Sequence, residues 1–204
     1  TTNIVNREQA LKAFEAAKSY SRSVIVERFI TGYDFRCLVI NYKFICAALR
    51  TPASVVGDGK NTIQWLIDET NKDPRRGYGH EKVLTQITID QFTQKMLDDV
   101  AYTLETIPKK GERVLLKPTA NLSTGGTSTD VTDEVHPANI FMFERIAKII
   151  GLDICGIDIM VSDLRSPVAE NGGAILEVNA APGFRMHIDP SEGLPRNVAE
   201  PVVD

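Results

Sequence analysis

Three oxygen-bearing side chains lie in two short apolar segments near the C-terminus of the sequence. Asp158 is part of the run at residues 155–160, and Glu177 and Asn179 are part of the run at residues 175–179. Because successive strand residues point to opposite faces, Glu177 and Asn179 share one face of their strand. Two carboxylates among Ile, Leu and Val side chains repel each other unless a cation lies between them. Such oxygen ligands suit Mg²⁺, although a solvated sheet face explains the spacing equally well.

A hairpin is the element that would bring these side chains together. The loop between the two segments, residues 163–173, is rich in Asp, Ser, Pro, Asn and Gly, which is typical of a hairpin connection. We expect the hairpin to place Asp158 opposite Glu177, so that three polar side chains converge on one small volume.

A second group of candidate residues surrounds the sequence Glu-Arg-Phe-Ile at residues 27–30. A strand that stops at Gly32 leaves backbone N–H and C=O groups without partners, free to bond the edge of a planar ligand. Asp34 and Arg36 share the next strand face, where a carboxylate could bind a ribose diol and a guanidinium could bind phosphate or carboxylate. An exposed ion pair on an edge strand is the alternative.

A third group is a run of small residues that follows Lys117. Residues 121–126, Asn-Leu-Ser-Thr-Gly-Gly, form a segment that we name the 121–126 loop. Consecutive small residues expose backbone N–H groups that can bind an anion, and Lys117 supplies a point charge for phosphate. The Gly-x4-Gly-Lys-Ser/Thr order of a Walker loop is absent, and a flexible surface loop is the alternative interpretation.

The remaining pattern predicts helices and antiparallel hairpins without a regular βαβ order, which favours an α+β fold. Helical spacing or capping residues predict helices at 7–20, 62–71, 88–97 and 137–150, with Asn6 and Asn61 as N-caps and Gly151 as a C-cap. Strand patterns are found at 23–30, 34–41, 42–50, 103–110 and 112–117, and loops are expected at 73–82 and 121–133.

The composition excludes several classes of function. The 204 residues carry a net charge of −4, which argues against a nucleic-acid-binding protein, and no apolar run is long enough to span a membrane. The cysteines Cys37, Cys46 and Cys155 are scattered in apolar runs, which is typical of reduced core cysteines in a cytoplasmic protein.

Taken together, these motifs resemble the ATP-grasp ligases. The resemblance rests on residues 27–36, the 121–126 loop, Asp158 and the run Glu-Val-Asn-Ala-Ala-Pro-Gly-Phe-Arg-Met-His at residues 177–187. Within that family the motifs are most similar to those of the cyanophycin synthetases. The resemblance spans the chain and implies an ATP-grasp fold, a mainly antiparallel sheet with flanking helices. It assigns residues 1–50 to the end of a small subdomain and residues 51–204 to a larger subdomain with an insertion.

The resemblance also implies a role for each motif, with ATP and Mg²⁺ as cofactors. Residues 27–30 would form the hinge that reads the adenine edge, and Asp34 would hold the ribose. The implied nucleotide-binding residues are Glu27, Arg28, Phe29, Ile30, Asp34, Ser123, Gly125 and Gly126. Asp158, Glu177 and Asn179 would hold two Mg²⁺ ions. Arg36, Lys117 and Asn121 would neutralise charge on the transferred phosphoryl group.

One position departs from the pattern of related D-alanine–D-alanine ligases. Those enzymes carry an Arg two residues before the metal-binding Asp, where this sequence has Gly156. We expect Arg36 or Arg185 to take its place. The glycine-rich phosphate flap of the family is expected upstream of Thr1, so that the chain alone would bind nucleotide weakly and would not turn over.

The resemblance implies a ligase that activates a carboxylate as an acyl phosphate. Its substrates would be L-aspartate and a cyanophycin primer, with L-arginine added by a companion domain, in a homo-oligomer that binds neither nucleic acid nor membrane. Two alternatives are the ATP-grasp half of a bifunctional glutathione synthetase and a non-catalytic nucleotide-binding module.

Overall fold

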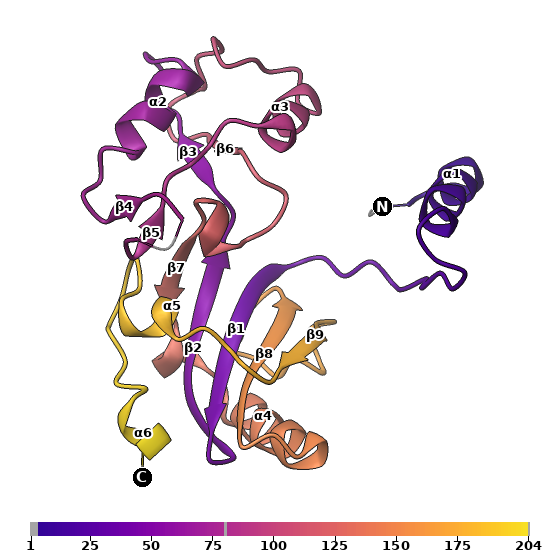
Figure 1. Ribbon diagram of the computed structural model, residues 1–204, viewed down its shortest axis with the longest axis vertical. Coiled ribbons are helices and arrows are strands. Elements are labelled where there is room, and N and C mark those ends of the chain that lie inside the picture. The colour runs from indigo at the N-terminus through magenta and orange to yellow at the C-terminus, as the bar shows by residue number, and fades with distance from the viewer. Residues whose placement is uncertain (1–3, 80, 204) are drawn as a thin grey trace.

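A five-stranded antiparallel sheet forms the centre of the protein in the computed structural model, which describes residues 4–79 and 81–203 (Figure 1). The strand order is β7-β2-β1-β8-β9, and every neighbouring pair is antiparallel. The strands are β1 (Tyr33–Ile40), β2 (Lys43–Thr51), β7 (Thr127–Asp130), β8 (Ile154–Val161) and β9 (Ala174–Asn179). The predicted hairpin at the C-terminal end is confirmed as β8 and β9, with Asp158 opposite Glu177.

The β1–β2 hairpin is the inner part of this sheet, and two local features set its register. Asn41 and Tyr42 form the turn with φ angles of 51° and 60°, the left-handed values that suit a two-residue hairpin. A β-bulge follows, because Leu38 pairs with Cys46 whereas Val39 pairs with Phe44, which leaves Ile45 without a partner. Beyond the bulge, Asp34 lies opposite Arg50.

The two faces of the sheet are covered differently. The 14-residue helix α4 (Pro137–Ile150) packs on one face, where Phe143 and Ala147 join Cys37, Ile157 and other buried side chains in the main core. Helix α5 (Arg185–Ile188) and the chain that follows it cover one end of the other face, above Leu38 and Cys46. The remainder of this second face carries the charged side chains described below.

An insertion between β2 and β7 forms a unit with its own core, which we name the insertion unit (residues 53–116). Ile63, Ile67, Leu97 and Leu116 are fully buried in it. Its elements are β3 (Ser54–Val56), α2 (Ile63–Thr70), β4 (Arg76–Gly77), β5 (Leu84–Thr85), α3 (Gln91–Asp98) and β6 (Arg113–Leu115). In Figure 1 this unit stacks above the end of the sheet.

The N-terminal helix α1 (Arg7–Lys18) confirms the first predicted helix, and Asn6 caps it by accepting a hydrogen bond from the Gln9 amide. The strand predicted at residues 23–30 is wrong. Residues 24–32 have no strand pairing, and together with α1 they extend away from the sheet (Figure 1). The β-branched composition of this segment favours strand geometry, but a strand also needs a neighbour, and the described part of the chain supplies none.

Other expectations require smaller corrections. Thr62 rather than Asn61 caps α2, and α3 begins at Gln91 because Asp90 forms a capping box with Thr93. Residues 103–110 form no strand, and the polar stretch 121–133 contains β7 between the 3-10 turns η1 (Leu122–Thr124) and η2 (Thr132–Glu134). The expected 73–82 loop contains β4. A short helix, α6 (Glu200–Val203), is the last element of the chain that the structure describes.

The α+β class and the helix at 137–150 with its Gly151 C-cap are confirmed. Within the described residues, no helix combines the length and apolar character that a membrane crossing requires. The division of the chain at residue 50 stays a prediction.

Candidate functional site

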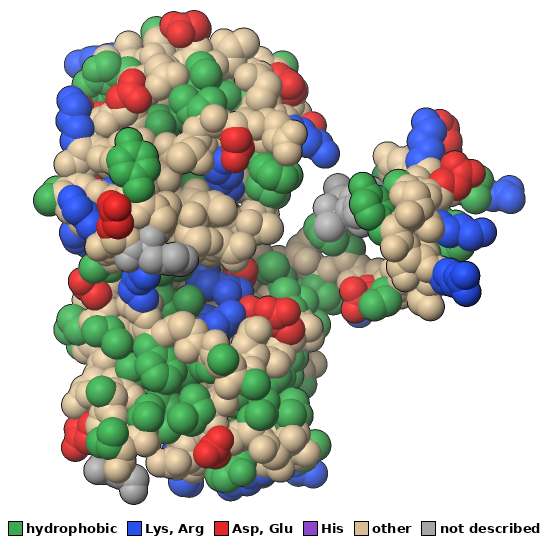
Figure 2. All heavy atoms as spheres, in the orientation of Figure 1, with side chains coloured by type: hydrophobic (Ala, Val, Ile, Leu, Met, Phe, Trp, Pro, Cys, Tyr) green, Lys and Arg blue, Asp and Glu red, His purple; other side chains and the backbone are tan. Residues whose placement is uncertain are grey.

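A cavity of about 920 Å³ lies between the charged face of the sheet and the insertion unit. Its floor is formed by side chains of β1, β2 and β8, and its roof by Arg113 and Leu115 of β6 and by residues 118–121. Figure 2 shows Lys, Arg and acidic side chains gathered in the indentation between the two units. Five predicted site residues line the cavity, namely Asp34, Arg36, Asn121, Asp158 and Glu177.

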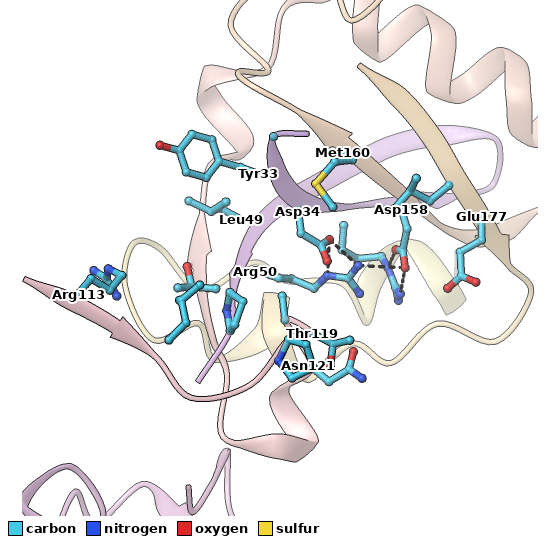
Figure 3. A pocket seen from close by; sticks show the side chains of 18 residues that line it. Tyr33, Asp34, Leu49, Arg50, Arg113, Thr119, Asn121, Asp158, Met160 and Glu177 are labelled. Carbon is cyan, nitrogen blue, oxygen red and sulfur yellow. Dashed lines mark hydrogen bonds and ion pairs between the residues drawn. The ribbon is translucent and has the colours of Figure 1, made fainter. Parts of the chain in front are cut away.

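The register of the sheet explains why these polar side chains meet. Arg36 lies opposite Asp158, and Asp158 lies opposite Glu177, so the three form one cross-strand row on β1, β8 and β9. Residues in such a row point to the same face, which is here the cavity side. Asp34 and Arg50 form the next row. In Figure 3 the carboxylates of Asp34 and Asp158 flank the guanidinium group of Arg50, and Glu177 lies beside Asp158.

Two arginines and two aspartates form a buried charge cluster on the cavity floor. Arg36 donates from Nε to Asp158 Oδ1 and from Nη2 to Asp158 Oδ2, the latter at 2.8 Å. Arg50 donates to Asp34 Oδ1 from Nε at 2.9 Å and from Nη2 at 2.5 Å, and its Nη2 lies 3.0 Å from Asp158 Oδ2. Asp158 therefore accepts charge-assisted hydrogen bonds from one arginine and contacts a second.

Burial and pairing act differently on the two carboxyl groups. Burial raises the pKa of Asp34, and the charge of Arg50 and its hydrogen bond offset this only in part. Burial also opposes ionisation of Asp158, but the hydrogen bond from Arg36 and the charges of Arg50 and Arg36 outweigh it and lower the pKa of Asp158. Asp158 is therefore held firmly as a carboxylate, which is the form that a cation binds.

The 121–126 loop is more closed than its sequence suggests. The Thr124 and Gly126 amides donate to the Asn121 carbonyl at 3.1 Å, and the Gly125 amide donates to the Leu122 carbonyl. These three N–H groups are therefore used inside the loop and are not available to a phosphate in this conformation. Gly126 is required sterically, since a Cβ there would lie 2.8 Å from the carbonyl oxygens of Asn121 and Thr51.

Lys117 is turned away from the cavity. Its side chain is buried, and Nζ lies 2.6 Å from Asp90 Oδ2 at the N-terminus of α3. The hydrogen bond from Lys117 lowers the pKa of Asp90. In this conformation Lys117 joins α3 to the strand that leads into the 121–126 loop, and it does not line the cavity.

Sequence comparison relates the chain to synthetases. The scan against protein-family models finds no match. Over its whole length the chain is 53% identical to cyanophycin synthetase from Trichormus variabilis and spans 23% of that protein. It is 54% identical to cyanophycin synthetase from Crocosphaera subtropica, of which it spans 24%. The chain is homologous to one region of cyanophycin synthetase. It thus spans about a quarter of the length of these curated relatives.

A second group of relatives contains glutathione enzymes. The chain is 35% identical to the bifunctional glutathione biosynthesis protein of Clostridium perfringens, over 98% of the chain and 26% of that protein. Its fold matches the crystal structure of a bifunctional glutathione synthetase from Pasteurella multocida with a TM-score of 0.76 at 34% identity, over 97% of the chain and 27% of that structure. The fold is that of the ATP-grasp enzymes, as the motifs predict.

In this cyanophycin synthetase homologue, some predicted residues lie apart from the cavity. Glu27, Arg28 and Phe29 are exposed, and Glu27 instead lines a smaller cavity of about 510 Å³ between α1 and residues 24–27. Ser123, Gly125, Gly126, Asn179 and Arg185 do not line the main cavity either. Arg185 donates to the Lys82 carbonyl at 3.2 Å. The roles of these residues in nucleotide binding stay predictions.

The predicted metal ligands are two carboxylates and one amide. Among the described residues, no group of three or more His, Cys, Asp and Glu side chains could hold a metal ion. Asp158 and Glu177 nevertheless face the cavity from neighbouring positions, and the Asn179 amide donates to Glu177 Oε1 at 3.1 Å. This donor set suits Mg²⁺, which takes few protein ligands and completes its shell with water and phosphate oxygens.

Arg50 is the site residue that sequence reasoning missed. Counting back from the turn at Asn41 without a bulge places Arg50 opposite Tyr33, on the other face from Asp34. The bulge at Ile45 reverses this and brings Arg50 to the cavity floor.

Arg36, in contrast, was predicted. Its side chain crosses Gly156, where an added Cβ would lie 2.9 Å from Arg36 Cδ. Arg36 thus fills the space above the position at which related ligases carry an arginine.

Proposed function

We propose that this chain is the ATP-binding part of a ligase that adds L-aspartate to a growing cyanophycin chain. The main support for this proposal is the charged cavity floor. There Asp158 and Glu177 lie side by side, next to Arg36 and Arg50. The identity of 53% to a cyanophycin synthetase supports the substrate assignment. L-Arginine would be added by a companion domain, and the intact enzyme would act in the cytoplasm as a homo-oligomer.

The proposed reaction needs charge stabilisation more than covalent chemistry by the protein. Bound Mg²⁺ would shield the nucleotide phosphates, and Asp158, Glu177 and Asn179 would hold it. Arg36 and Arg50 would stabilise negative charge on the transferred phosphoryl group and on the carboxylate that receives it. Because both guanidinium groups are already fixed by carboxylates, little reorganisation would accompany the reaction. Asp34 would receive the ribose hydroxyls beside Arg50.

A chimeric enzyme tests this function directly. The matching region of the Trichormus variabilis cyanophycin synthetase is replaced by this chain, and ADP release is measured with Mg²⁺, a cyanophycin primer and L-aspartate. We expect primer- and aspartate-dependent ADP release. In the same chimera, Glu177→Gln keeps the shape of the side chain but removes its charge, and we expect a large loss of activity. Full activity of Glu177→Gln would contradict the metal assignment.

A second candidate function is that of the glutathione synthetases, which the match in fold favours. γ-Glutamylcysteine and glycine replace primer and L-aspartate in the same assay. ADP release with this pair alone would favour the second function. The chain can also be titrated with ATP in a calorimeter, with and without Mg²⁺. Heat that does not depend on Mg²⁺ would instead favour a non-catalytic module.

A further inference from the structure

Arg76 is a buried arginine of the insertion unit that forms no salt bridge with a carboxylate among the described residues. Its exposed fraction is 6%, similar to the 8% of Arg36 and of Arg50. Those two arginines contact Asp158 and Asp34, whereas the side chain of Arg76 donates only to backbone carbonyls. The Nε atom of Arg76 is buried and has no hydrogen-bond partner in the described part of the chain.

A buried guanidinium in this state is unfavourable by itself. Moving an ion out of water costs several kcal/mol unless an opposite charge compensates for it. Arg76 stays charged, because the ordinary pKa of a guanidinium is so high that burial cannot deprotonate it near neutral pH. Asp73 exerts some charge on Arg76, but its carboxylate is already paired with Arg75. The described part of the protein therefore keeps a buried positive charge without a salt-bridged counterion, as a site that binds an anion would do.

The contacts of Arg76 show where that charge acts. Its Nη1 donates to the Thr85 carbonyl at 2.6 Å and to the Gly125 carbonyl at 3.1 Å. Gly125 belongs to the 121–126 loop, and the first residue of that loop, Asn121, lines the main cavity. Arg76 therefore joins the insertion unit to the loop without lining the cavity itself.

The loop is packed closely against this support. Gly125 has a φ of +94°, and an added Cβ would lie 2.9 Å from the side chain of Ile87. The Ile87 amide and carbonyl are in turn bonded by the side chain of Asn71, the C-cap residue of α2. A fixed charge that supports a closely packed loop acts on an anion near that loop without any rearrangement, which makes it effective in a region of low dielectric constant.

We propose that Arg76 is a positioning residue whose buried charge and carbonyl contacts hold the 121–126 loop beside a phosphoryl group bound in the cavity. This inference rests on the proposed function and adds a residue from the insertion unit to it. Arg76 acts through the loop and does not line the cavity, so its effect should depend on charge and should be confined to ligands that carry phosphate.

Two variants separate charge from hydrogen bonding. Arg76→Gln can still donate to a carbonyl but carries no charge, whereas Arg76→Lys keeps the charge on a differently shaped side chain. By calorimetry with MgATP, we expect Arg76→Gln to raise the Kd about tenfold and Arg76→Lys to change it less than about threefold. With adenosine, which has no phosphate, both variants should bind as the wild type does.

Arg75→Gln is the matched control. Arg75 is the next residue, is more exposed and pairs with Asp73 at 2.8 Å, so its loss should leave MgATP binding unchanged. Thermal melting followed by circular dichroism establishes that each variant is folded. A further measurement needs no variant: inorganic phosphate should raise the melting temperature of the wild type more than chloride at equal ionic strength.

The outcomes are distinguishable. Equal MgATP affinity in wild type and Arg76→Gln would overturn the role of Arg76 while leaving the proposed function intact. Equal losses in Arg76→Gln and Arg76→Lys, or a parallel loss of adenosine binding, would reduce Arg76 to a structural contact. A wild-type chain that binds no MgATP would overturn the proposed function and this inference with it. If Arg76→Gln does not fold, a missing phosphate effect on wild-type melting would overturn the inference.

Discussion

The cavity floor and residues 27–30, which lie within the segment at residues 22–32, were both expected to bind the nucleotide, yet only the floor is built from paired strands. The floor lies on three paired strands, and each charged side chain has partners on the neighbouring strand. Residues 22–32 have a comparable β-branched and aromatic composition but no strand partner, and Val26 is 86% exposed. A side chain thus acquires a defined place when strands on both sides fix it, and local composition alone does not achieve this.

We expect the largest loss of stability from a substitution at the centre of the charge cluster on the cavity floor. Asp158→Ala removes the acceptor that Arg36 binds and Arg50 contacts, and leaves buried guanidinium charge uncompensated. We expect a loss of about 3–5 kcal/mol in the free energy of unfolding, measured with urea. Glu177→Ala, on the exposed edge strand, is the control and should cost less than about 0.5 kcal/mol. A loss below about 1 kcal/mol for Asp158→Ala would mean that the charge cluster does not stabilise the floor.

A pH titration tests how helix α5 packs on the same face of the sheet. His187 of α5 is buried without a hydrogen-bond partner among the described residues, and burial, aided by the charges of Arg36 and Arg50 and opposed by Asp130, lowers its pKa from 6.5 to about 4. Because the unfolded chain takes up this proton first, stability is fully present above pH 6.5 and is lost as the pH falls towards 4.

The expected contribution of His187 is about 3 kcal/mol between these two pH values. Carboxyl groups titrate in the same range, so the measurement is the difference between the wild type and His187→Phe, whose stability should depend less steeply on pH. Urea unfolding at several pH values gives both curves. Parallel curves would show that the imidazole is hydrated or paired in the folded protein.

A smaller effect is expected where Arg36 crosses the sheet. Gly156→Ala places a Cβ 2.8 Å from Pro182 Cβ and 2.9 Å from Arg36 Cδ, so one of these groups has to move. We expect a loss of about 1–3 kcal/mol, as for other overpacked sites. Gly183→Ala is a suitable control, because an added Cβ there meets nothing within 4 Å. Equal stability of the two variants would show that Arg36 can shift without cost.

The smallest effect is expected in the unpaired segment. Phe29→Ala alters a side chain that is 53% exposed and should change the free energy of unfolding by less than about 0.5 kcal/mol. Thermal or urea unfolding is sufficient to measure it. A loss above about 1 kcal/mol would show that residues 22–32 pack against a surface in solution, and the contrast between the two regions would disappear.

Local pattern predicted those parts of the fold in which alternation and turn residues agree. The β8–β9 hairpin and the face shared by Asp158 and Glu177 are examples. Residues 103–110 have a strand-like composition for another reason: Leu104 packs against the core of the insertion unit, while the carbonyls of Leu104 and Thr106 accept from the first amides of α2. β7 was missed because its four residues, Thr-Ser-Thr-Asp, are polar and its pairing with β2 is long-range.

Charge partners were harder to predict than charged residues. Lys117 was identified as a cation, but its partner Asp90 comes from a helix 27 positions earlier, and no spacing rule connects the two. The resemblance to ATP-grasp ligases supplied the fold and the order of the motifs. Contacts made by the insertion unit, such as those of Arg76, depend on its own packing and became visible only in three dimensions.

The bulge at Ile45 makes the place of Arg50 depend on the number of residues between the turn and Cys46. Deleting one residue there would give a regular ladder in which Arg50 stays opposite Asp34. Inserting one residue there, with a single bulge kept, would shift the rest of β2 by one position and turn Arg50 to the α4 side. Every residue that lines the site would still be encoded. A single-codon insertion near the turn would thus remove the second arginine from the floor as completely as mutating it, and a substitution scan would not detect this dependence.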